Sequence, residues 1–364
     1  MRVLTVGGAM IDTIAVIANE RIERMTMRNA DASFLLLEQG RKNEADEIST
    51  HCGGGAVNAA VAMARLGHDV AALIKLGPDA RAETILRRLE DEGVSTRYAI
   101  RDPRAPTGAS VLISAHDRNA AIFTFRGANT LLEPHDLKKE AFAARLVYVS
   151  SLSNESAGCF PSIVAHAKSE GALVAVNPGI RQLSLRRNPF RDSISKIDIL
   201  AINRDEADAL VPLLVAIGGE GGPQTENSNG TTLPYLARRG FVMGGFELSM
   251  LGFFDRVLNL GPKWVVVTDG SRGAYVGSHS GCLFCPPVHV DVTGSAGAGD
   301  AFNATFACCI AASVPVEDAA LYAATNAASV VTYLDTQTGL LRQPELQARV
   351  AKVRESADLI HWPL

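Results

Sequence analysis

An aspartate in a glycine-rich turn has the surroundings that point most directly to chemistry. Residues 297–300 have the sequence Gly-Ala-Gly-Asp and lead into residues 302–312, an apolar stretch rich in Ala, Phe and Cys that contains no Pro. This composition predicts a buried helix. The free backbone N–H groups at the start of a helix, together with the helix dipole, form a binding site for an anion.

Asp300 at the mouth of such a site allows two interpretations. A carboxylate and a bound phosphate repel each other, so the pairing makes sense if the carboxylate removes a proton from an attacking hydroxyl. The N–H groups of residues 298–300 would then hold the phosphoryl group. Alternatively, Asp300 only caps the helix, as aspartate often does. The turn by itself favours neither interpretation.

A second glycine-rich segment also precedes a predicted helix. Gly53, Gly54 and Gly55 open an Ala-rich stretch that closes at Gly67, which fits the rules for helix ends. Glycines let a small polar ligand approach the backbone. Asn58 lies in the first turn, where its amide can donate to one hydroxyl and accept from another. Alone, this segment is a weak indication of a binding site.

The elements around these turns predict an α/β fold with a parallel sheet. Residues 146–150, 157–169 and 172–176 have the pattern of strand, helix and strand, which is a βαβ unit. Ligands in such folds bind beyond the carboxyl ends of the strands. Further buried strands are expected at residues 3–6, 70–76, 197–201 and 264–268.

Composition and charge exclude several classes of function. The net charge of −4 argues against a nucleic-acid or anionic-membrane surface, and no apolar run reaches the roughly 18 residues of a membrane helix. Cys282 and Cys285 form a lone Cys-x-x-Cys, whereas structural zinc usually needs about four ligands. The six cysteines therefore indicate core thiols in the reducing cytoplasm. The Gly-x-x-x-x-Gly-Lys-Ser/Thr motif of a P-loop is absent.

Both glycine segments, in this order, resemble the signatures of the ribokinase, or PfkB, family of carbohydrate and nucleoside kinases. The first matches Gly-Gly-x-x-x-Asn-x-Ala ending in Ala-Arg-Leu-Gly, and the second matches the Gly-Ala-Gly-Asp turn. One departure stands out. Asp291 and Asp300 are nine positions apart (300 − 291), which is longer than the family spacing, so residues 294–296 look inserted.

The resemblance implies a three-layer, doubly wound, mostly parallel sheet in one domain covering residues 1–364. It also implies a small β-sheet lid, from about 20–50 and 107–126. Residues 216–246 have loop composition and are expected to form a surface insertion. A lid sheet with one apolar face cannot stand alone in water, so it should cover the substrate, a second subunit, or both.

The implied reaction moves the γ-phosphoryl group of ATP to a hydroxymethyl group of a sugar, with Asp300 as general base. Mg²⁺ is the implied metal, contacted by Glu206 through water, and K⁺ is a further candidate. The phosphoryl group would lie against Gly297, Ala298 and Gly299. The expected substrate residues are Asp12, Gly53, Gly54, Gly55, Asn58 and Arg126, and the expected nucleotide residues are Asn203, Glu206, Thr268, Gly270, Gly273 and Asn326.

Two alternatives remain at this point. The segment Asn177-Pro178-Gly179 replaces the acidic strand end common in sugar kinases, which favours a nucleoside such as adenosine as the acceptor. A non-catalytic binding protein for a sugar or nucleoside would be indicated if Asp300 were replaced, and it is present. The expected partners are therefore a small molecule and a second subunit, with no nucleic acid or membrane.

Overall fold

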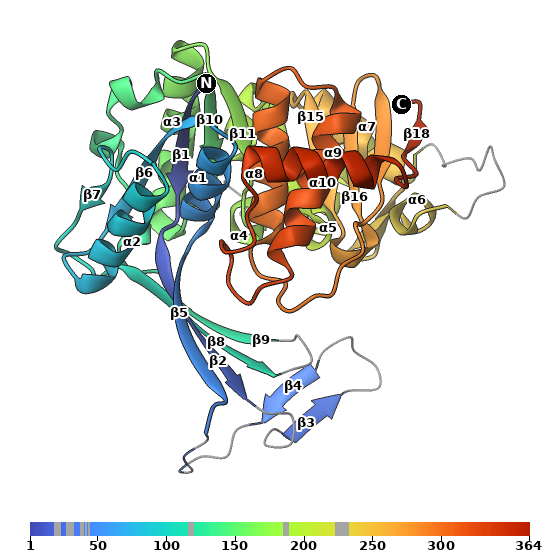
Figure 1. The fold of residues 1–364 in the computed structure, drawn as a ribbon. Helices are drawn as coiled ribbons and strands as arrows, with labels where there is room; N and C mark the ends of the chain where they lie inside the picture. The colour runs from blue at the N-terminus through green and yellow to red at the C-terminus, as the bar shows by residue number, and fades with distance from the viewer. Residues whose placement is uncertain are drawn as a thin grey trace.

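The computed structural model describes residues 1–17, 23–26, 33–36, 40, 42, 44–115, 120–184, 189–222 and 233–364. Its centre is a ten-stranded sheet, in which the strands from β15 to β7 pair in parallel (Figure 1). The strand order is β18 (Ile360–Trp362), β17 (Gly281–Cys285), β16 (Ala274–Ser278), β15 (Trp264–Thr268), β12 (Ile199–Asn203), β11 (Leu173–Val176), β10 (Leu146–Val149), β1 (Arg2–Gly7), β6 (Asp69–Leu76) and β7 (Ile100–Arg101).

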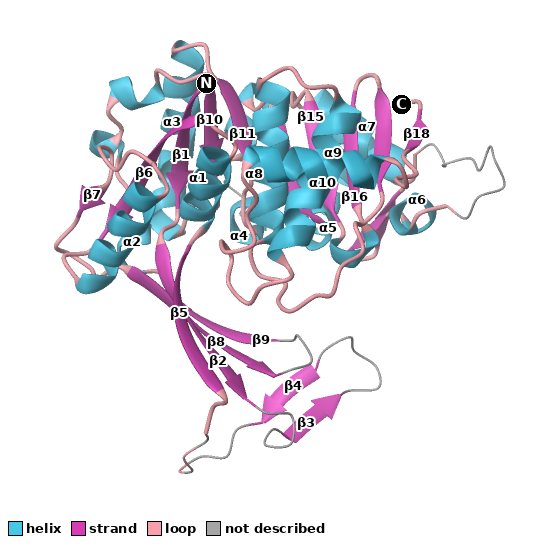
Figure 2. Cartoon of the chain, in the orientation of Figure 1, coloured by secondary structure: helices cyan, strands magenta, loops and turns pink. Residues whose placement is uncertain are grey.

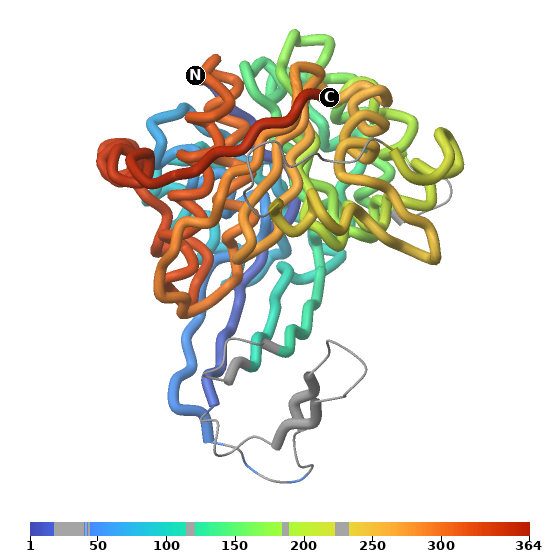
Figure 3. Tube along the Cα trace, turned by 90° about the vertical axis from the view of Figure 1, so that its right-hand side faces the viewer, coloured from blue at the N-terminus to red at the C-terminus, as the bar shows by residue number. Residues whose placement is uncertain are grey.

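Helices cover both faces of this sheet (Figure 3). One face carries α1 (Gly55–Arg65), α2 (Ala80–Asp91), α8 (Ala298–Ala311), α9 (Val316–Val330) and α10 (Gln343–Arg354). The other carries α3 (Phe160–Ser169), α5 (Arg204–Gly218), α6 (Tyr235–Arg239) and α7 (Met250–Asn259). The side chains of strand β10 are buried on both faces: Leu146 and Tyr148 pack on the first, and Val147 and Val149 on the second. Strands buried on both faces are typical of parallel sheets.

Short helical segments complete the connections. They are α4 (Ile180–Ser184) and the 3₁₀ turns η2 (Gly127–Thr130), η3 (Pro134–Asp136), η4 (Lys139–Phe142), η5 (Asn154–Cys159), η6 (Arg191–Lys196) and η7 (Gly270–Arg272). Among the residues described, no helix has both the length and the apolar character that crossing a membrane requires.

A four-stranded lid sheet projects from the body, at the end opposite the two termini (Figure 2). Its order is β5 (Glu47–Gly53), β2 (Met10–Ile17), β8 (Gly108–Ala115) and β9 (Ala120–Phe125). The expected lid segment 107–126 contains the antiparallel pair of β8 and β9. Strand β2 was not expected in the lid. Within 20–50, β3 (Glu23–Thr26) and β4 (Ser33–Leu36) form a separate pair, and much of that segment lies outside the described residues.

The lid exposes large apolar side chains. Ile122 and Phe123 are about 60% exposed, and Ile48, Val111 and Phe125 are also exposed. Water-facing residues of this size in one small sheet are unusual for an isolated monomer, since contiguous apolar patches generally mark interaction surfaces.

The described flanks of the expected surface insertion at 216–246 form regular elements, although the segment has loop composition. Helix α6 and the hairpin of β13 (Phe241–Met243) and β14 (Phe246–Leu248) pack on the body. Leu236 and Phe241 are fully buried, and the ring of Phe241 lies 4.1 Å from that of Phe253. Because glycines dominate the local composition, the sequence gives no indication that these two residues are buried. Residues 223–232 lie outside the described part.

All six cysteines are free. Cys282 and Cys285 both lie in β17 and belong to hydrophobic clusters on opposite faces of the sheet. Burial raises the pKa of Cys285 to about 12, which keeps it a neutral thiol. The pair therefore does not form a metal site.

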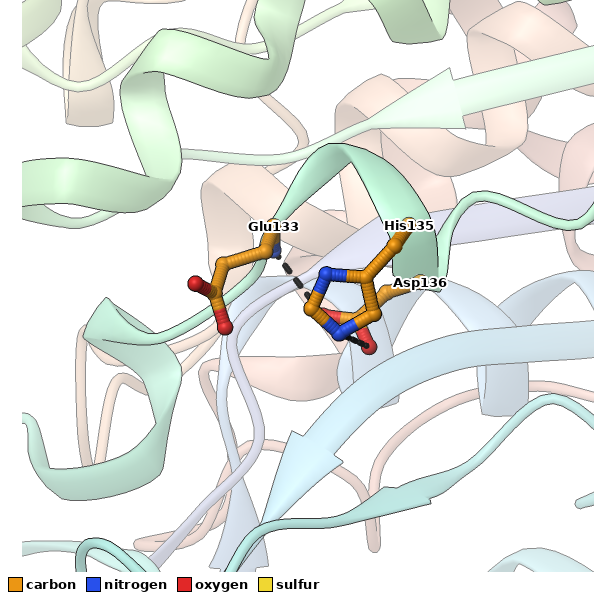
Figure 4. A group of neighbouring side chains, drawn as sticks. All are labelled: Glu133, His135 and Asp136. Atoms are coloured by element: carbon orange, nitrogen blue, oxygen red, sulfur yellow. Dashed lines mark hydrogen bonds and ion pairs between the residues drawn. The ribbon is translucent and has the colours of Figure 1, made fainter.

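A buried lysine near the sheet edge holds several acidic groups together. The Lys75 ammonium, 3% exposed, lies 2.6 Å from Asp136 Oδ2 and 3.0 Å from Asp102 Oδ2. Figure 4 shows Asp136 beside Glu133 and His135, three groups close enough together to bind a metal. Lys75 and Arg104 already neutralise these acids, because Arg104 pairs with Glu133. The cluster is therefore a salt-bridge network.

Replacing this lysine should destabilise the fold. The variant K75M leaves the buried Asp136 carboxylate without its lysine, while Asp102 keeps its pair with Arg104. Removing one partner of a buried ion pair costs about 3–5 kcal/mol. We expect that loss in the free energy of unfolding from urea denaturation. The matched control is K139A, which removes an exposed pair 3.5 Å from Glu170 and should cost less than about 1 kcal/mol. Equal losses for both variants would contradict the network's role.

Candidate active site

Asp300 lies in the first turn of α8 and is held by α1. The Nδ2 group of Asn58 donates a hydrogen bond of 2.8 Å to Asp300 Oδ2. The residue that precedes the helix is Gly297, and no side chain caps the turn. The capping interpretation of Asp300 is therefore wrong. The first N–H groups of α8 have no partner within the helix and are available to an anion.

The turn before α8 requires glycine at one position. Gly297 has φ of +80°, a left-handed conformation that favours glycine. A Cβ atom there would also lie 2.7 Å from the Cβ of Thr336. By contrast, a Cβ on Gly299 would meet nothing within 4 Å, so Gly299 faces open space at the start of the helix.

The Asn58 side chain is fixed by the loop that follows α9. Its Oδ1 accepts hydrogen bonds from Thr336 Oγ1 at 2.9 Å and from Gln337 Nε2 at 3.1 Å. These bonds set which end of the amide points to Asp300 and leave one Nδ2 hydrogen for a ligand. Sequence reasoning missed Thr336 and Gln337 because no local pattern marks a contact across almost 280 positions.

The glycines before α1 make room for carboxylates. A Cβ on Gly53 would lie 1.9 Å from Asp12 Oδ2. A Cβ on Gly55 would lie 2.9 Å from the Cβ of Ser150 and 3.4 Å from Asp300 Oδ1. Gly53, Gly55, Asp12, Ser150 and Asp300 therefore surround one small space at the carboxyl ends of β1 and β10.

Asp12 lies in the lid strand β2, opposite His51 of β5. Its Oδ1 accepts a hydrogen bond from the Ser110 hydroxyl of β8, a partner that the sequence did not suggest. Burial raises the pKa of Asp12 in spite of this bond and of the nearby His51. Asp12 thus brings a carboxylate from the lid to the small space around Gly53.

Two other carboxyl groups have raised pKa values. Burial is the main cause for Asp300; the charge of Asp12 adds to it and the bond from Asn58 opposes it. Burial raises the pKa of Glu206 to about 7, with smaller contributions from the charges of Asp205 and Asp300. A carboxylate with a raised pKa in a cleft is typical of a catalytic base.

A cavity of about 490 Å³ opens on the other side of the α8 N-terminus. Thr268, Gly270 and Gly273, from the end of β15 and the turn after it, line this cavity, as do Ala298 and Gly299. The first turn of α8 therefore lies between the cavity and the space around Asp12 and Gly53. A phosphate chain in the cavity could reach the free N–H groups.

Asn203 and Glu206 form a reciprocal capping box at the start of α5, with both hydrogen bonds at 2.9 Å. Only Glu206 Oε2 is used in this box. Arg126, which follows β9 directly, donates from Nη1 to Ser153 Oγ at 2.8 Å.

The expectation that Asn326 contacts the nucleotide does not agree with its surroundings. It is fully buried, its Nδ2 donates to Thr305 Oγ1 and its Oδ1 accepts from the backbone of Leu341, both at 2.9 Å. It therefore joins α8, α9 and the following loop instead of contacting a nucleotide. The face of α9 toward the cavity is formed by Ala324, Ala327 and Ala328.

Comparison with known proteins shows to which family the chain belongs. The pattern of the pfkB family carbohydrate kinase matches residues 22–216 and 254–343. The chain belongs to the pfkB family of carbohydrate kinases. The deoxyribokinase of Salmonella typhi is 28% identical over 331 residues, 89% of this chain and 94% of that protein. The ribokinase of Staphylococcus aureus (strain COL) is 26% identical over 284 residues, 75% of this chain and 81% of that one.

The fold is shared with solved ribokinase structures. Arabidopsis thaliana ribokinase, complexed with ribose and ATP, matches with a TM-score of 0.72 at 21% identity, covering 96% of this chain and 98% of that one. The family membership and these relatives identify the protein as a sugar kinase that uses ATP.

The bond between Asn58 and Asp300 can be tested through the pH dependence of the kinase activity. It lowers the pKa of Asp300, so N58A should raise that pKa and move the acid limb of the pH profile of kcat/KM to higher pH. Losing a hydrogen bond to a charged group costs roughly 1.5–3 kcal/mol, or about 10- to 150-fold in rate. The milder variant T336V, which removes one donor to Asn58, should cause a smaller shift. An unmoved acid limb in N58A would show that the bond does not tune the carboxylate.

Proposed function

We propose that this kinase transfers the γ-phosphoryl group of ATP to a hydroxymethyl group of a sugar, with Asp300 as general base. One observation carries the proposal. Asp300 occupies the turn of α8 that separates the cavity lined by Thr268 and Gly270 from the space around Asp12 and Gly53. A nucleotide on one side and a hydroxylated acceptor on the other would meet at this carboxylate.

Different residues have different roles in the proposed reaction. The carboxylate of Asp12 and the remaining N–H of Asn58 hold acceptor hydroxyls and direct one toward Asp300. The acceptor O–H bond breaks and its proton passes to Asp300, while the oxygen forms a bond to phosphorus and ADP leaves with the electrons of the old bond. The N–H groups of residues 298–300 stabilise the charge on the moving phosphoryl group.

The raised pKa of Asp300 suits this role. A base works best when its pKa approaches the working pH, because it then accepts a proton readily while remaining ionised. The Gly55 backbone and Ser150 close the site beside the carboxylate, which limits the access of water to the phosphoryl group.

The donor set near Asp300 fits Mg²⁺. This ion keeps most of its waters and uses one or two carboxylates with substrate phosphates. Glu206 Oε2 is occupied by its own capping box, which leaves Oε1 to accept hydrogen bonds from metal-bound water. Bound Mg²⁺ supplies neutralisation of the phosphate charges. K⁺ stays a prediction of the family resemblance, and the free cysteines support the cytoplasm as the compartment.

The geometry does not favour the nucleoside alternative. That alternative depends on Asn177, whose Nδ2 donates a 2.8 Å hydrogen bond to the carbonyl of Ala201. The amide therefore ties β11 to β12.

The variant D300N tests the assigned base. It keeps the shape of the side chain and removes its ability to accept a proton. Loss of a general base costs about 10²–10⁴-fold in rate, so we expect kcat, measured by ADP release with the preferred sugar, to fall in that range. Turnover within a factor of a few of wild type would reject the role.

The variant D12A is the companion measurement. Loss of one buried hydroxyl contact costs about 1–3 kcal/mol, so the KM for the sugar should rise while the affinity for ATP changes little. A fall in ATP affinity with unchanged sugar affinity would mean that the two sides of the site are assigned in reverse.

We also propose a homodimer formed through the lid. The exposed side chains of Ile48, Val111, Ile122, Phe123 and Phe125 support it, because a small sheet gains stability when such residues are covered. The lid also carries Asp12, so its closure over the acceptor would exclude water from the reaction.

Light scattering at micromolar concentration should give the mass of a dimer for wild type and of a monomer for F123S. Hydrogen exchange of residues 44–53 and 107–126 should slow when the acceptor binds. The control K139A, on the body, should leave the mass unchanged. A wild-type monomer whose lid exchange ignores the acceptor would contradict both parts of the proposal.

A further inference from the structure

Two arginines near the acceptor side of the site lack an acidic partner. Arg126 follows strand β9 directly, and Arg181 lies in α4. Among the described residues, Arg126 donates one hydrogen bond, to the Ser153 hydroxyl at 2.8 Å, and Arg181 makes no hydrogen bond or ion pair. A guanidinium has five N–H donors, so most of the donors of this pair are unused.

Arg126 contacts the loop that follows β10, and the residue next to Arg181 contacts it too. Arg126 contacts this loop at Ser153. The residue after Arg181, Gln182, accepts a 2.8 Å hydrogen bond from the backbone N–H of Leu152. The same loop begins with Ser150, which packs against Gly55 beside Asp300. Three Cα steps separate Ser150 from Ser153, so the span between them is at most about 11 Å.

The surroundings make this an electropositive position. Burial is the first cause that lowers the pKa of Arg126, and the positive charge of Arg181 is the second. Two cations that are close enough to interact, one of them partly buried, repel each other. An anion between them would relieve both the repulsion and the lost hydration, and no described carboxylate forms an ion pair with either of them.

We infer that the acceptor of this kinase carries an anionic group, a phosphate or a carboxylate, which binds to Arg126 and Arg181. This inference rests on the proposed function. The anion lies at the end of the acceptor away from the hydroxymethyl group that faces Asp300. The loop 150–153 connects the two positions, and its span suits a sugar with charge at one end and the reacting hydroxyl at the other.

Arginine is suited to this task. Its planar fork binds two oxygens of a carboxylate or phosphate at once, which fixes the orientation as well as adding affinity. The Ser153 hydroxyl holds the Arg126 side chain in place before the ligand arrives, so less rotamer entropy is lost on binding. A neutral sugar would leave both arginines without an anionic partner.

The test uses matched acceptors that differ only in the charged group: ribose with ribose 1-phosphate, fructose with fructose 6-phosphate, and glucitol with gluconate. Each has a free hydroxymethyl group. Wild type, R126A, R181A and the surface control R97A are compared by ADP release. We expect wild type and R97A to prefer the anionic member of at least one pair, by kcat/KM, and each arginine variant to lower that preference by roughly 10- to 150-fold, mainly through KM. The phosphate and carboxylate pairs distinguish the two sources of the anion.

The outcomes separate this inference from the proposed function. ADP release that favours the neutral member of every pair would overturn the anion site and leave the kinase assignment intact. A loss of kcat with neutral and anionic acceptors alike would place the arginines on the phosphoryl group of ATP and overturn the inference. If no acceptor yields ADP, the proposed function fails, and calorimetry decides the anion site separately. Binding of an anionic member to wild type that R126A weakens supports the site, and binding that R126A does not change, or no binding, overturns it.

Discussion

The hydrogen bond between Asn58 and Asp300 joins the first turns of two helices that lie far apart in the chain. Every other feature of the site depends on these two turns meeting. Asn58 is oriented by Thr336 and Gln337, and Gly297 permits the left-handed turn that brings Asp300 to it. The base we propose must stay within hydrogen-bond reach of its target, and this network fixes the position of Asp300 without a ligand.

The sequence predicted the parts of the site that local chemistry determines. Glycines opening a helix, or the spacing of Asn203 and Glu206, leave a pattern within a few residues. Partners such as Ser110 could not be predicted, because a serine in a strand has an ordinary local sequence and its contact with Asp12 depends on strand register. Asn326 was misassigned for a related reason: helix packing decides which face of α9 meets the cavity.

The fold was predictable to a similar extent. Buried strands of a parallel sheet are continuous apolar runs, and the predicted strands match those of the structure within a few positions. Strand β2 was missed because Asp12 and Thr13 interrupt its apolar residues, in a segment that follows closely on β1. Helix α6 and the hairpin of β13 and β14 were missed because Phe241 and Leu236 gain their burial from α7 and from Tyr275, whose hydroxyl accepts from the Leu236 backbone.

The lid and the site share a fixed point, which limits how closure can work. The Asn129 side chain accepts from the backbone N–H of Ala9 at 2.9 Å and donates to its carbonyl at 2.8 Å, and strand β2 begins at the next residue. Asp12 is three positions from this anchor, whereas the exposed residues of β9 lie farther out. Rotation of the sheet about Ala9 would therefore move its outer end much more than Asp12. The carboxylate can keep its place against Gly53 while the outer lid opens and closes, so acceptor binding and lid closure need not compete for the same geometry.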